Sequence, residues 1–306
     1  KILKKNQRVV IFDTGLGFPR NMFLNLKNLI LFKPFFKIQT RIGKPDLNIR
    51  KKLISKFCKK NTMNDNLLKI AIENIPLSFL EDFCKIKDNV NDLALPEKPK
   101  VIFTSNFLMD TQKTRYIAEC INKGTKLIIG QHGGGYGNFK INFYQKHEID
   151  ISDKYLTWGW KENKNNIQLG IINSNILKIK RKENRENLLY VMFNNSRYVK
   201  ALQSYNGSKY LHNYYYKFSP QFIKNLKGKA SNKLLVRYIY NDLIKGGGGD
   251  FNWSVEKFLK KKFNKININS QKGEITNLMA NSKLIVCNKL ATAYLEALYS
   301  NIPTIL

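Results

Sequence analysis

The fold is decided by a short strand and the glycine-rich loop that follows it, Lys126-Leu-Ile-Ile-Gly-Gln131-His132-Gly133-Gly134-Gly135-Tyr136-Gly137. The apolar run from Leu127 to Ile129 predicts a buried strand within Lys126–Gly130. The glycines after it allow the backbone to approach a ligand closely. A histidine at the carboxyl end of a strand, followed by exposed backbone N–H groups, suits proton transfer beside an anion. The alternative is a mobile glycine turn with an incidental histidine, and the neighbouring segments argue against it.

The segments before this loop alternate between strand and helix patterns. The expected elements are strands at Arg8–Phe12 and Lys100–Ser105, a helix that starts near Pro76, and a helix over Asp110–Lys123 that Gly124 closes as a C-cap. This alternation is typical of βαβ units in a parallel sheet. Ligands of such sheets bind beyond the carboxyl ends of the strands, which is where His132 falls.

A second series of strands and helices follows a charged stretch, Ile179 to Asn187. Its expected elements are strands at Asn187–Phe193, Lys233–Tyr240 and Ser282–Asn288, a loop at Gly246–Gly249, a helix at Thr292–Leu298 and a last strand within Asn301–Leu306. The sequence therefore predicts an α/β protein with two domains, residues 1–184 and 185–306.

The composition is that of a folded protein with a large positive charge. Of the 306 residues, 43% are hydrophobic, which supports packed cores and argues against disorder. The formal net charge of +31 comes mostly from lysines spread along the chain. No RNA-binding signature, zinc-finger spacing or basic zipper accompanies it, so we expect no specific nucleic-acid partner. The charge is interpreted as compositional bias and as attraction to anionic substrates or an anionic membrane surface.

The cysteines and the apolar runs bear on the compartment. Four cysteines lie far apart, which fits free thiols in a reducing environment. No apolar run approaches the roughly 18 residues that a membrane span needs, and the amino end lacks a signal-peptide core. We therefore expect a cytoplasmic protein that can lie at the inner face of the plasma membrane. The chain stops at Pro303-Thr-Ile-Leu306, as a strand begins, so we also expect a fragment of a longer protein.

Several catalytic motifs are absent from the sequence. There is no D-x-D, so the metal-dependent GT-A mechanism lacks its ligands. The P-loop, the G-x-S-x-G elbow and H-E-x-x-H are missing as well. With three histidines and scattered cysteines, no metal site is expected.

The glycine loop and several later motifs resemble the LIC12162-type family of surface-polysaccharide transferases. The residues that carry the resemblance are Gln131–Gly137, Glu148, Ser152–Trp160, Asn74–Pro76 with Phe79–Glu81, Val236-Arg237 and Ala291–Pro303. The last of these blocks is shared more widely, with GT-B glycosyltransferases. The resemblance implies a GT-B-like fold, in which two Rossmann-like domains with parallel sheets face a cleft. It also implies an incomplete amino-terminal acceptor-side domain and a truncated carboxyl-terminal donor domain.

Transfer of a sugar needs a base for the acceptor hydroxyl, and His132 is the first candidate. Its unperturbed pKa of about 6.5 leaves neutral imidazole available at cytoplasmic pH. Glu148 or Asp153 could orient the imidazole or serve as the base instead; each is equally a candidate for a plain surface or capping carboxylate. The backbone of the loop, with Gln131, Gly133, Gly134 and Gly135, would hold substrate or phosphate.

For the donor, the start of the helix at Thr292 offers N–H groups and the helix dipole to a phosphate. Glu296, one turn further on, could accept hydrogen bonds from ribose hydroxyls or lie on a solvated helix face. Arg237, at a strand end, could bind phosphate with two hydrogen bonds or form a structural ion pair. One departure from the family pattern is Asn288, followed by Lys289, where an acidic residue often stands before this helix.

Three functions fit these observations. The first is a metal-independent glycosyltransferase that uses a nucleotide-activated sugar, without a cofactor, and a surface polysaccharide or lipid-linked acceptor. The second is a non-catalytic carbohydrate- or nucleotide-binding module of a surface-polymer assembly system. The third, a lysine-rich RNA-binding protein, would show strongly salt-dependent binding to arbitrary RNA.

Overall fold

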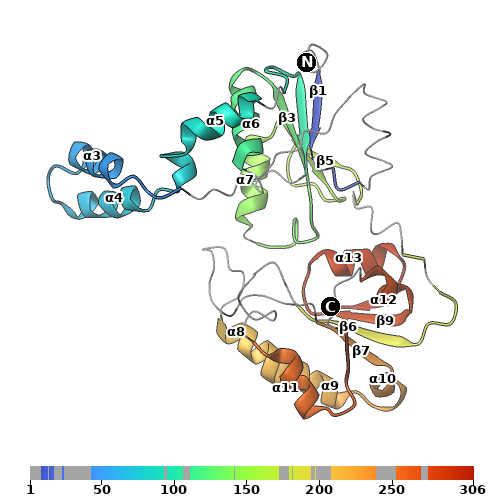
Figure 1. The fold of residues 1–306 in the computed structure, drawn as a ribbon. Coiled ribbons are helices and arrows are strands. Elements are labelled where there is room, and N and C mark those ends of the chain that lie inside the picture. Colours follow the sequence, from blue (N-terminus) through green and yellow to red (C-terminus); the bar gives the residue numbers. More distant parts are fainter. Residues whose placement is uncertain are drawn as a thin grey trace. The chain divides into compact units, whose positions relative to one another are not determined.

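The structure is a computed structural model, shown as a ribbon in Figure 1. It describes residues 8–12, 14–16, 23, 43–92, 95–105, 111–140, 142–171, 179–180, 182–193, 197, 208–238, 253–269 and 275–306.

The chain forms two compact units. The first comprises Lys1–Gln131 and His147–Ile172, and the second comprises His132–Lys146 and Asn173–Leu306. The glycine loop therefore groups with the second unit, although the strand before it belongs to the first. This division is based on compactness alone, so the domains 1–184 and 185–306 stay a prediction.

The first unit contains a parallel five-stranded sheet in the order β1-β2-β3-β4-β5. Its strands are β1 (Val9–Phe12), β2 (Val101–Thr104), β3 (Lys126–Gly130), β4 (Lys154–Thr157) and β5 (Asn166–Gln168). Helix α6 (Thr111–Asn122) connects β2 to β3, and α7 (Phe143–Ile151) precedes β4. The described strands follow one another in sequence order, so this sheet has no point at which the strand order reverses.

Helices α3 (Leu47–Phe57) and α4 (Met63–Glu73) form a hairpin in the first unit (Figure 1). A buried arginine joins their ends, because the Arg50 guanidinium donates to the carbonyl oxygens of Ile72, Glu73 and Ile75 at 2.8–2.9 Å. The same guanidinium pairs with Glu81 at 2.8 Å, which lowers the pKa of that carboxyl to about 2. Arg50 thus acts as the cap for the carboxyl end of α4.

A helical segment begins directly after Pro76, as predicted, but it is short. Only a 3-10 turn, η1 (Leu77–Phe79), follows Pro76, and the next helix, α5 (Phe83–Asp92), begins later. The backbone of Leu80 leaves the helical region, with φ −132° and ψ −84°. Because the helix is interrupted here, Glu81 lies within reach of Arg50 and forms an ion pair with it.

The second unit contains a parallel five-stranded sheet in the order β10-β9-β6-β7-β8. Its strands are β6 (Asn187–Val191), β7 (Leu234–Arg237), β8 (Asn267–Asn269), β9 (Ser282–Cys287) and β10 (Thr304–Ile305). Read from β8, the order is third, second, first, fourth, fifth, which is the order of a Rossmann sheet. The order reverses between β6 and β9, and such a reversal is where α/β sheets bind ligands.

Helices cover this second sheet and enclose two apolar clusters. They are α8 (Ser208–Asn213), a π-helical turn η4 (Tyr214–Phe218), α9 (Ser219–Asn225), α10 (Gly228–Asn232), α11 (Val255–Lys262), α12 (Thr276–Ala280) and α13 (Thr292–Tyr299). One cluster is rich in aromatic side chains, including Tyr190, Tyr215 and Trp253. The other packs α13 against β9 through Ala297 and Ile285. The α/β class and the two Rossmann-like parallel sheets are confirmed.

The predicted strands and most predicted helices lie where the structure has them. The elements β1, β2, β3, β6, β7, β9 and β10 fall inside the predicted segments, and α6 and α13 end within one residue of theirs. Gly124 has φ +92° and its N–H donates to the carbonyl of Ile121, as expected of a helix C-cap. The loop expected at 246–249 lies outside the described residues.

Candidate functional site

Gln131 directly follows strand β3, and its side chain holds the next segments of the first unit in place. Its Oε1 accepts hydrogen bonds from the backbone N–H of Trp158 at 2.9 Å and from Nε1 of Trp160 at 2.8 Å. The residue is buried, and its own N–H donates to the carbonyl of Leu156. Gln131 therefore fixes the point at which the chain leaves the sheet, and the loop begins at His132.

His132 is exposed and lies against the ring of Tyr136. The Tyr136 hydroxyl is 3.1 Å from Nδ1 and 3.4 Å from Nε2 of the imidazole, and the two rings meet edge to face. Desolvation by the surrounding protein lowers the pKa of the imidazole below its usual value. At neutral pH the ring is therefore neutral, which is the form that can accept a proton.

The next part of the loop packs on the start of α13. A Cβ added at Gly134 would lie 2.5 Å from the carbonyl oxygen of Ala291 and 2.8 Å from Cα of Thr292. The Gly134 N–H also donates to Oγ1 of Thr292 at 3.2 Å. Only glycine fits so close an approach of two backbones, which explains why the loop needs a residue without a side chain here.

Asn138 ties the same two segments together a second time. Its amide Nδ2 donates to the carbonyl oxygen of Gly134 at 2.7 Å and to the hydroxyl of Tyr294 at 2.8 Å. Gly137 has φ +75° and its N–H donates to Oε1 of Gln145 at 2.6 Å. The glycine loop is thus a hydrogen-bonded structure that brings His132 near the amino end of α13.

That end of α13 lies at the carboxyl edge of the second sheet. The N-cap residue is Ala291, which makes no side-chain capping bond. The first N–H groups of a helix have no acceptor within the helix, so they are suited to an anion. The preceding strand is β9, which borders β6 at the reversal of strand order.

Lys289 and Phe193 lie side by side at this reversal. Lys289 follows β9 and Phe193 follows β6, and Nζ of the lysine is 3.5 Å from the centroid of the phenyl ring. Asn288 Oδ1 accepts a hydrogen bond from the Phe193 N–H at 3.0 Å, which ties the two strand ends together. Desolvation lowers the pKa of Lys289 to about 8, so the ammonium group is charged at pH 7.

Two predicted donor residues are buried near the same edge of the second sheet. Arg237 ends β7, donates to Oδ1 of Asn269 on β8, and has its pKa lowered by burial. Glu296 lies one turn into α13 and is buried, which raises its pKa. It therefore does not lie on a solvated helix face. Burial, and then the negative charge of Glu296, raises the pKa of Cys287 to about 12.

The two predicted carboxylates have structural partners in the first unit. Glu148 is buried on α7, and its Oε2 accepts a hydrogen bond from the Tyr155 hydroxyl at 3.2 Å. Asp153 accepts from Lys126 Nζ at 2.8 Å and from the Leu127 N–H at 2.9 Å. Both of its partners begin β3, whereas His132 follows the other end of that strand. Asp153 therefore lies at the amino end of β3, at the opposite end of that strand from Gln131.

The family was assigned by comparison with known proteins. The model of the LIC12162 family transferases matches residues 1–306, which is the whole chain. The chain belongs to the LIC12162 family of transferases. A comparison with curated proteins gave no match. The family assignment confirms the resemblance of the glycine loop and the α13 segment, and it identifies the protein as a transferase at a coarse level.

Sequence reasoning about this LIC12162 family transferase overlooked four residues of the site. They are Tyr136 and Asn138 in the glycine loop, and Phe193 and Lys289 beyond the strand ends. The signal for Tyr136 was present, because it lies four residues after His132 on a turn that brings the two rings together. Lys289 was noted only as the neighbour of Asn288, and nothing in the sequence paired it with Phe193, which lies 96 residues earlier.

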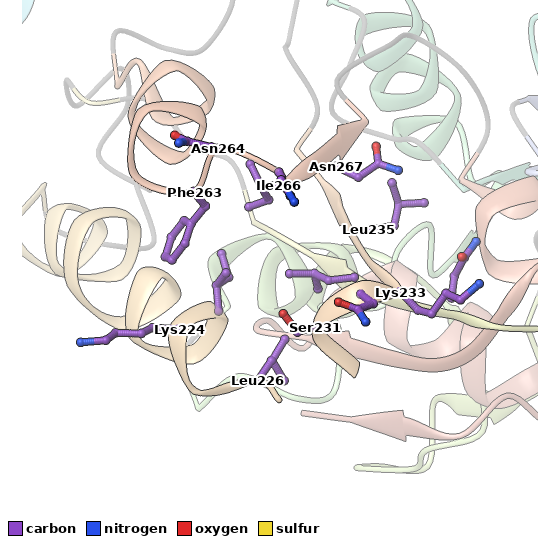
Figure 2. Close-up of a pocket in the computed structure, with 14 residues that line it drawn as sticks. Lys224, Leu226, Ser231, Lys233, Leu235, Phe263, Asn264, Ile266 and Asn267 are labelled. Carbon is purple, nitrogen blue, oxygen red and sulfur yellow. The ribbon is translucent and has the colours of Figure 1, made fainter. Parts of the chain in front are cut away.

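A separate cavity of about 610 Å³ opens at the amino edge of the second sheet (Figure 2). It is lined by the first residues of three strands, Asn187, Leu234 and Asn267, together with side chains such as Phe263 and Lys224. The strands of this sheet are parallel, so the cavity lies at the edge opposite Lys289. No residue proposed for the transferase site lines it.

The described ranges carry neither a cluster of metal ligands nor a membrane-spanning helix. No three side chains of His, Cys, Asp or Glu cluster there as metal ligands would. Among the helices that the structure describes, none combines the length and the apolar character needed to cross a bilayer.

Proposed function

We propose that this chain is a metal-independent glycosyltransferase of the GT-B type. It moves a sugar or a related group from a nucleotide-activated donor to a cell-surface polysaccharide or lipid-linked acceptor. The observation that carries the proposal is the contact of Gly134 with Thr292, which brings a neutral histidine near an uncapped helix start. A base and an anion site are the two elements that this transfer requires.

In the proposed reaction, His132 removes the proton from an acceptor hydroxyl. The hydroxyl oxygen attacks the anomeric carbon of the donor and forms the new glycosidic bond. The bond from that carbon to the donor phosphate oxygen breaks, and the nucleotide leaves with the electron pair on that oxygen. The proton stays on the imidazole until the product departs, so atoms and charge balance without a cofactor.

Tyr136 orients the base in this proposal. Its hydroxyl lies nearer to Nδ1 than to Nε2, at 3.1 Å against 3.4 Å. An Nδ1–H that donates to the phenolic oxygen would leave the lone pair of Nε2 for the acceptor proton. The lowered pKa of the ring supports this role, because the ring then remains neutral at cytoplasmic pH.

The donor phosphate is proposed to bind at the carboxyl edge of the second sheet. Three features support this position: the reversal of strand order between β6 and β9, the start of α13 and the cation of Lys289. Charge that develops on the leaving phosphate would be stabilised by the helix N–H groups and by the ammonium group. Arg237 belongs to the same edge and extends the positive potential.

Screening the full chain for thermal stabilisation by a panel of nucleotide sugars tests the donor site, since a ligand that binds only the folded state raises the melting temperature. The stabilising nucleotide is then incubated with acceptor extracts, and its release is followed in the parent and in His132→Ala. Release that the substitution abolishes supports the transferase. Binding without any release, in both proteins, would instead support the non-catalytic module.

A further inference from the structure

The α3–α4 hairpin exposes a stripe of large apolar side chains on α4. Met63, Leu67 and Ile70 are 72%, 54% and 56% exposed. Their spacing of four and then three residues places them on one face of the helix. Ile72, which is buried, lies half a turn away on the face that packs in the hairpin. The stripe is therefore a second apolar face that α4 turns to solvent.

Helix α3 adds apolar side chains to the same hairpin. Leu47 and Phe57, its first and last residues, are 65% and 54% exposed. A soluble helix usually buries its apolar stripe and exposes polar residues. In this hairpin most of the large apolar side chains are exposed instead, which marks an interaction surface.

The hairpin is also strongly basic. Residues 44–73 include eight basic and three acidic side chains, which gives a formal charge of +5. Exposed lysines stand on both helices, among them Lys52, Lys56 and Lys69. Lys56 lies over the ring of Phe57 at 5.4 Å, so charge and apolar surface adjoin. Lysines beside apolar side chains are the pattern of a helix that lies in a lipid interface.

We propose that the α3–α4 hairpin docks this protein on the surface of an anionic lipid bilayer. The stripe of Met63, Leu67 and Ile70 enters the boundary between headgroups and acyl chains, and the lysines contact the anionic headgroups. A second copy of the chain fits this surface poorly, because each copy carries a net charge of +31 and an equally basic hairpin. The proposal does not depend on the transferase chemistry.

The buried Arg50 makes this docking surface rigid. It holds the end of α4 to α3 and to Glu81, so the stripe is presented on a preformed hairpin. Because the stripe residues are exposed, their replacement removes little packing from the folded protein. Variants of the stripe therefore separate lipid binding from folding.

The test measures co-sedimentation of the full chain with phosphatidylcholine vesicles, with and without phosphatidylglycerol. The parent should bind the anionic vesicles and bind the neutral ones weakly. Met63→Gln/Leu67→Gln/Ile70→Gln should weaken binding on the order of tenfold or more, since three buried apolar side chains are lost from the interface. The matched control is Ile167→Gln/Leu169→Gln/Tyr210→Gln, whose parent side chains are also large, apolar and exposed but lie outside the hairpin, and which should bind as the parent does.

A second pair of variants tests the charge. Lys52→Gln/Lys56→Gln/Lys69→Gln should lose affinity for anionic vesicles, whereas Lys224→Gln/Lys257→Gln/Lys261→Gln, with the same net charge, should retain most of it. Equal binding by the stripe variant and its control would overturn the proposal. So would equal binding to neutral and anionic vesicles. If the stripe variant binds vesicles as the parent does, but sedimentation velocity shows a monomer where the parent is a dimer, the stripe is the interface with a second copy of the chain, and the proposal is overturned.

Discussion

The hydroxyl of Thr292 accepts a hydrogen bond from the backbone N–H of Gly134 at 3.2 Å, across 158 positions of sequence. This bond joins the loop after β3 to the start of α13, and Asn138 reinforces it through Tyr294. Neither the glycines nor the helix start makes a site alone. Their contact brings the loop that carries His132, the proposed base, to the start of α13, the proposed phosphate site, within one compact unit.

Gly134→Ala should disturb this contact. The new Cβ would lie 2.5 Å from the Ala291 carbonyl oxygen, so the loop or α13 must shift. We expect a loss of about 1–3 kcal/mol in the free energy of unfolding, as for other overpacked positions, together with reduced turnover. Urea unfolding and transfer assays measure both. Gly133→Ala is the matched control, because its Cβ would meet only Thr292 Oγ1 at 3.6 Å, and its effect on stability should be much smaller.

Lys289→Gln should weaken binding of the donor nucleotide. Removal of one charged hydrogen bond to phosphate costs about 1.5–3 kcal/mol, which calorimetric titration would show as a higher Kd. The pKa of Lys289 is about 8, so in the parent the cation is present below that pH and is lost as the pH rises through it. Donor affinity should therefore fall above pH 8 in the parent. If donor affinity still falls above pH 8 in Lys289→Gln, then a group other than Lys289 loses its proton in this pH range.

Arg237→Ala should also weaken donor binding, by about 1.5–3 kcal/mol if the guanidinium contacts phosphate. Arg237 is buried and bonded to Asn269, so a structural role must be separated from a binding role. Asn269→Ala removes the same internal bond and leaves the cation in place. Unchanged donor affinity in Arg237→Ala, or an equal loss in Asn269→Ala, would exclude direct phosphate contact.

Most of the sheet strands were predictable because each is a short apolar run ending in polar or glycine residues, whereas the short polar strands β5 and β8 were not predicted. Lys126–Gly130 and Ser282–Cys287 coincide with β3 and β9 in the structure for this reason. The site at the loop around His132 stays a prediction, made because carboxyl strand ends are where parallel sheets bind ligands. Local pattern therefore sufficed for the apolar strands and for the helices α6 and α13.

Contacts between distant segments could not be predicted in this way. Glu81 looked like part of a helix that starts near Pro76, yet it is the partner of Arg50, 31 residues earlier. Glu148 and Asp153 were candidates to orient His132 or to be plain structural carboxylates, and the fold shows hydrogen bonds from Tyr155 to Glu148 and from Lys126 to Asp153. Carboxylates carry no periodic signal that identifies their partner, so only the fold could assign them.

Arg50→Met should loosen the α3–α4 hairpin and leave the sheets intact. Three carbonyl oxygens and the Glu81 carboxylate lose their donor, so amides of α4 should exchange faster in hydrogen-exchange measurements. The pKa of Glu81 falls from 4.5 to about 2, so its contribution to stability is present above the unfolded value and is lost as the pH falls through about 2. Arg115→Met, at a surface pair with Glu119, is the control and should leave exchange in α4 unchanged.

His132→Gln should retain the fold and the affinity for the donor nucleotide, yet lose roughly 10²–10⁴ in turnover, the usual contribution of a positioned base. Desolvation by the surrounding protein lowers the pKa of His132, so the neutral ring persists to a lower pH than the ordinary histidine pKa would allow. Turnover of the parent should therefore fall on acidification with a midpoint below about 6.5, and the residual rate of His132→Gln should lack this step. Tyr136→Phe removes only the hydroxyl 3.1 Å from Nδ1, so it should reduce turnover less and shift the midpoint. Full turnover in His132→Gln, or an unaltered acid limb, would exclude the histidine as the base.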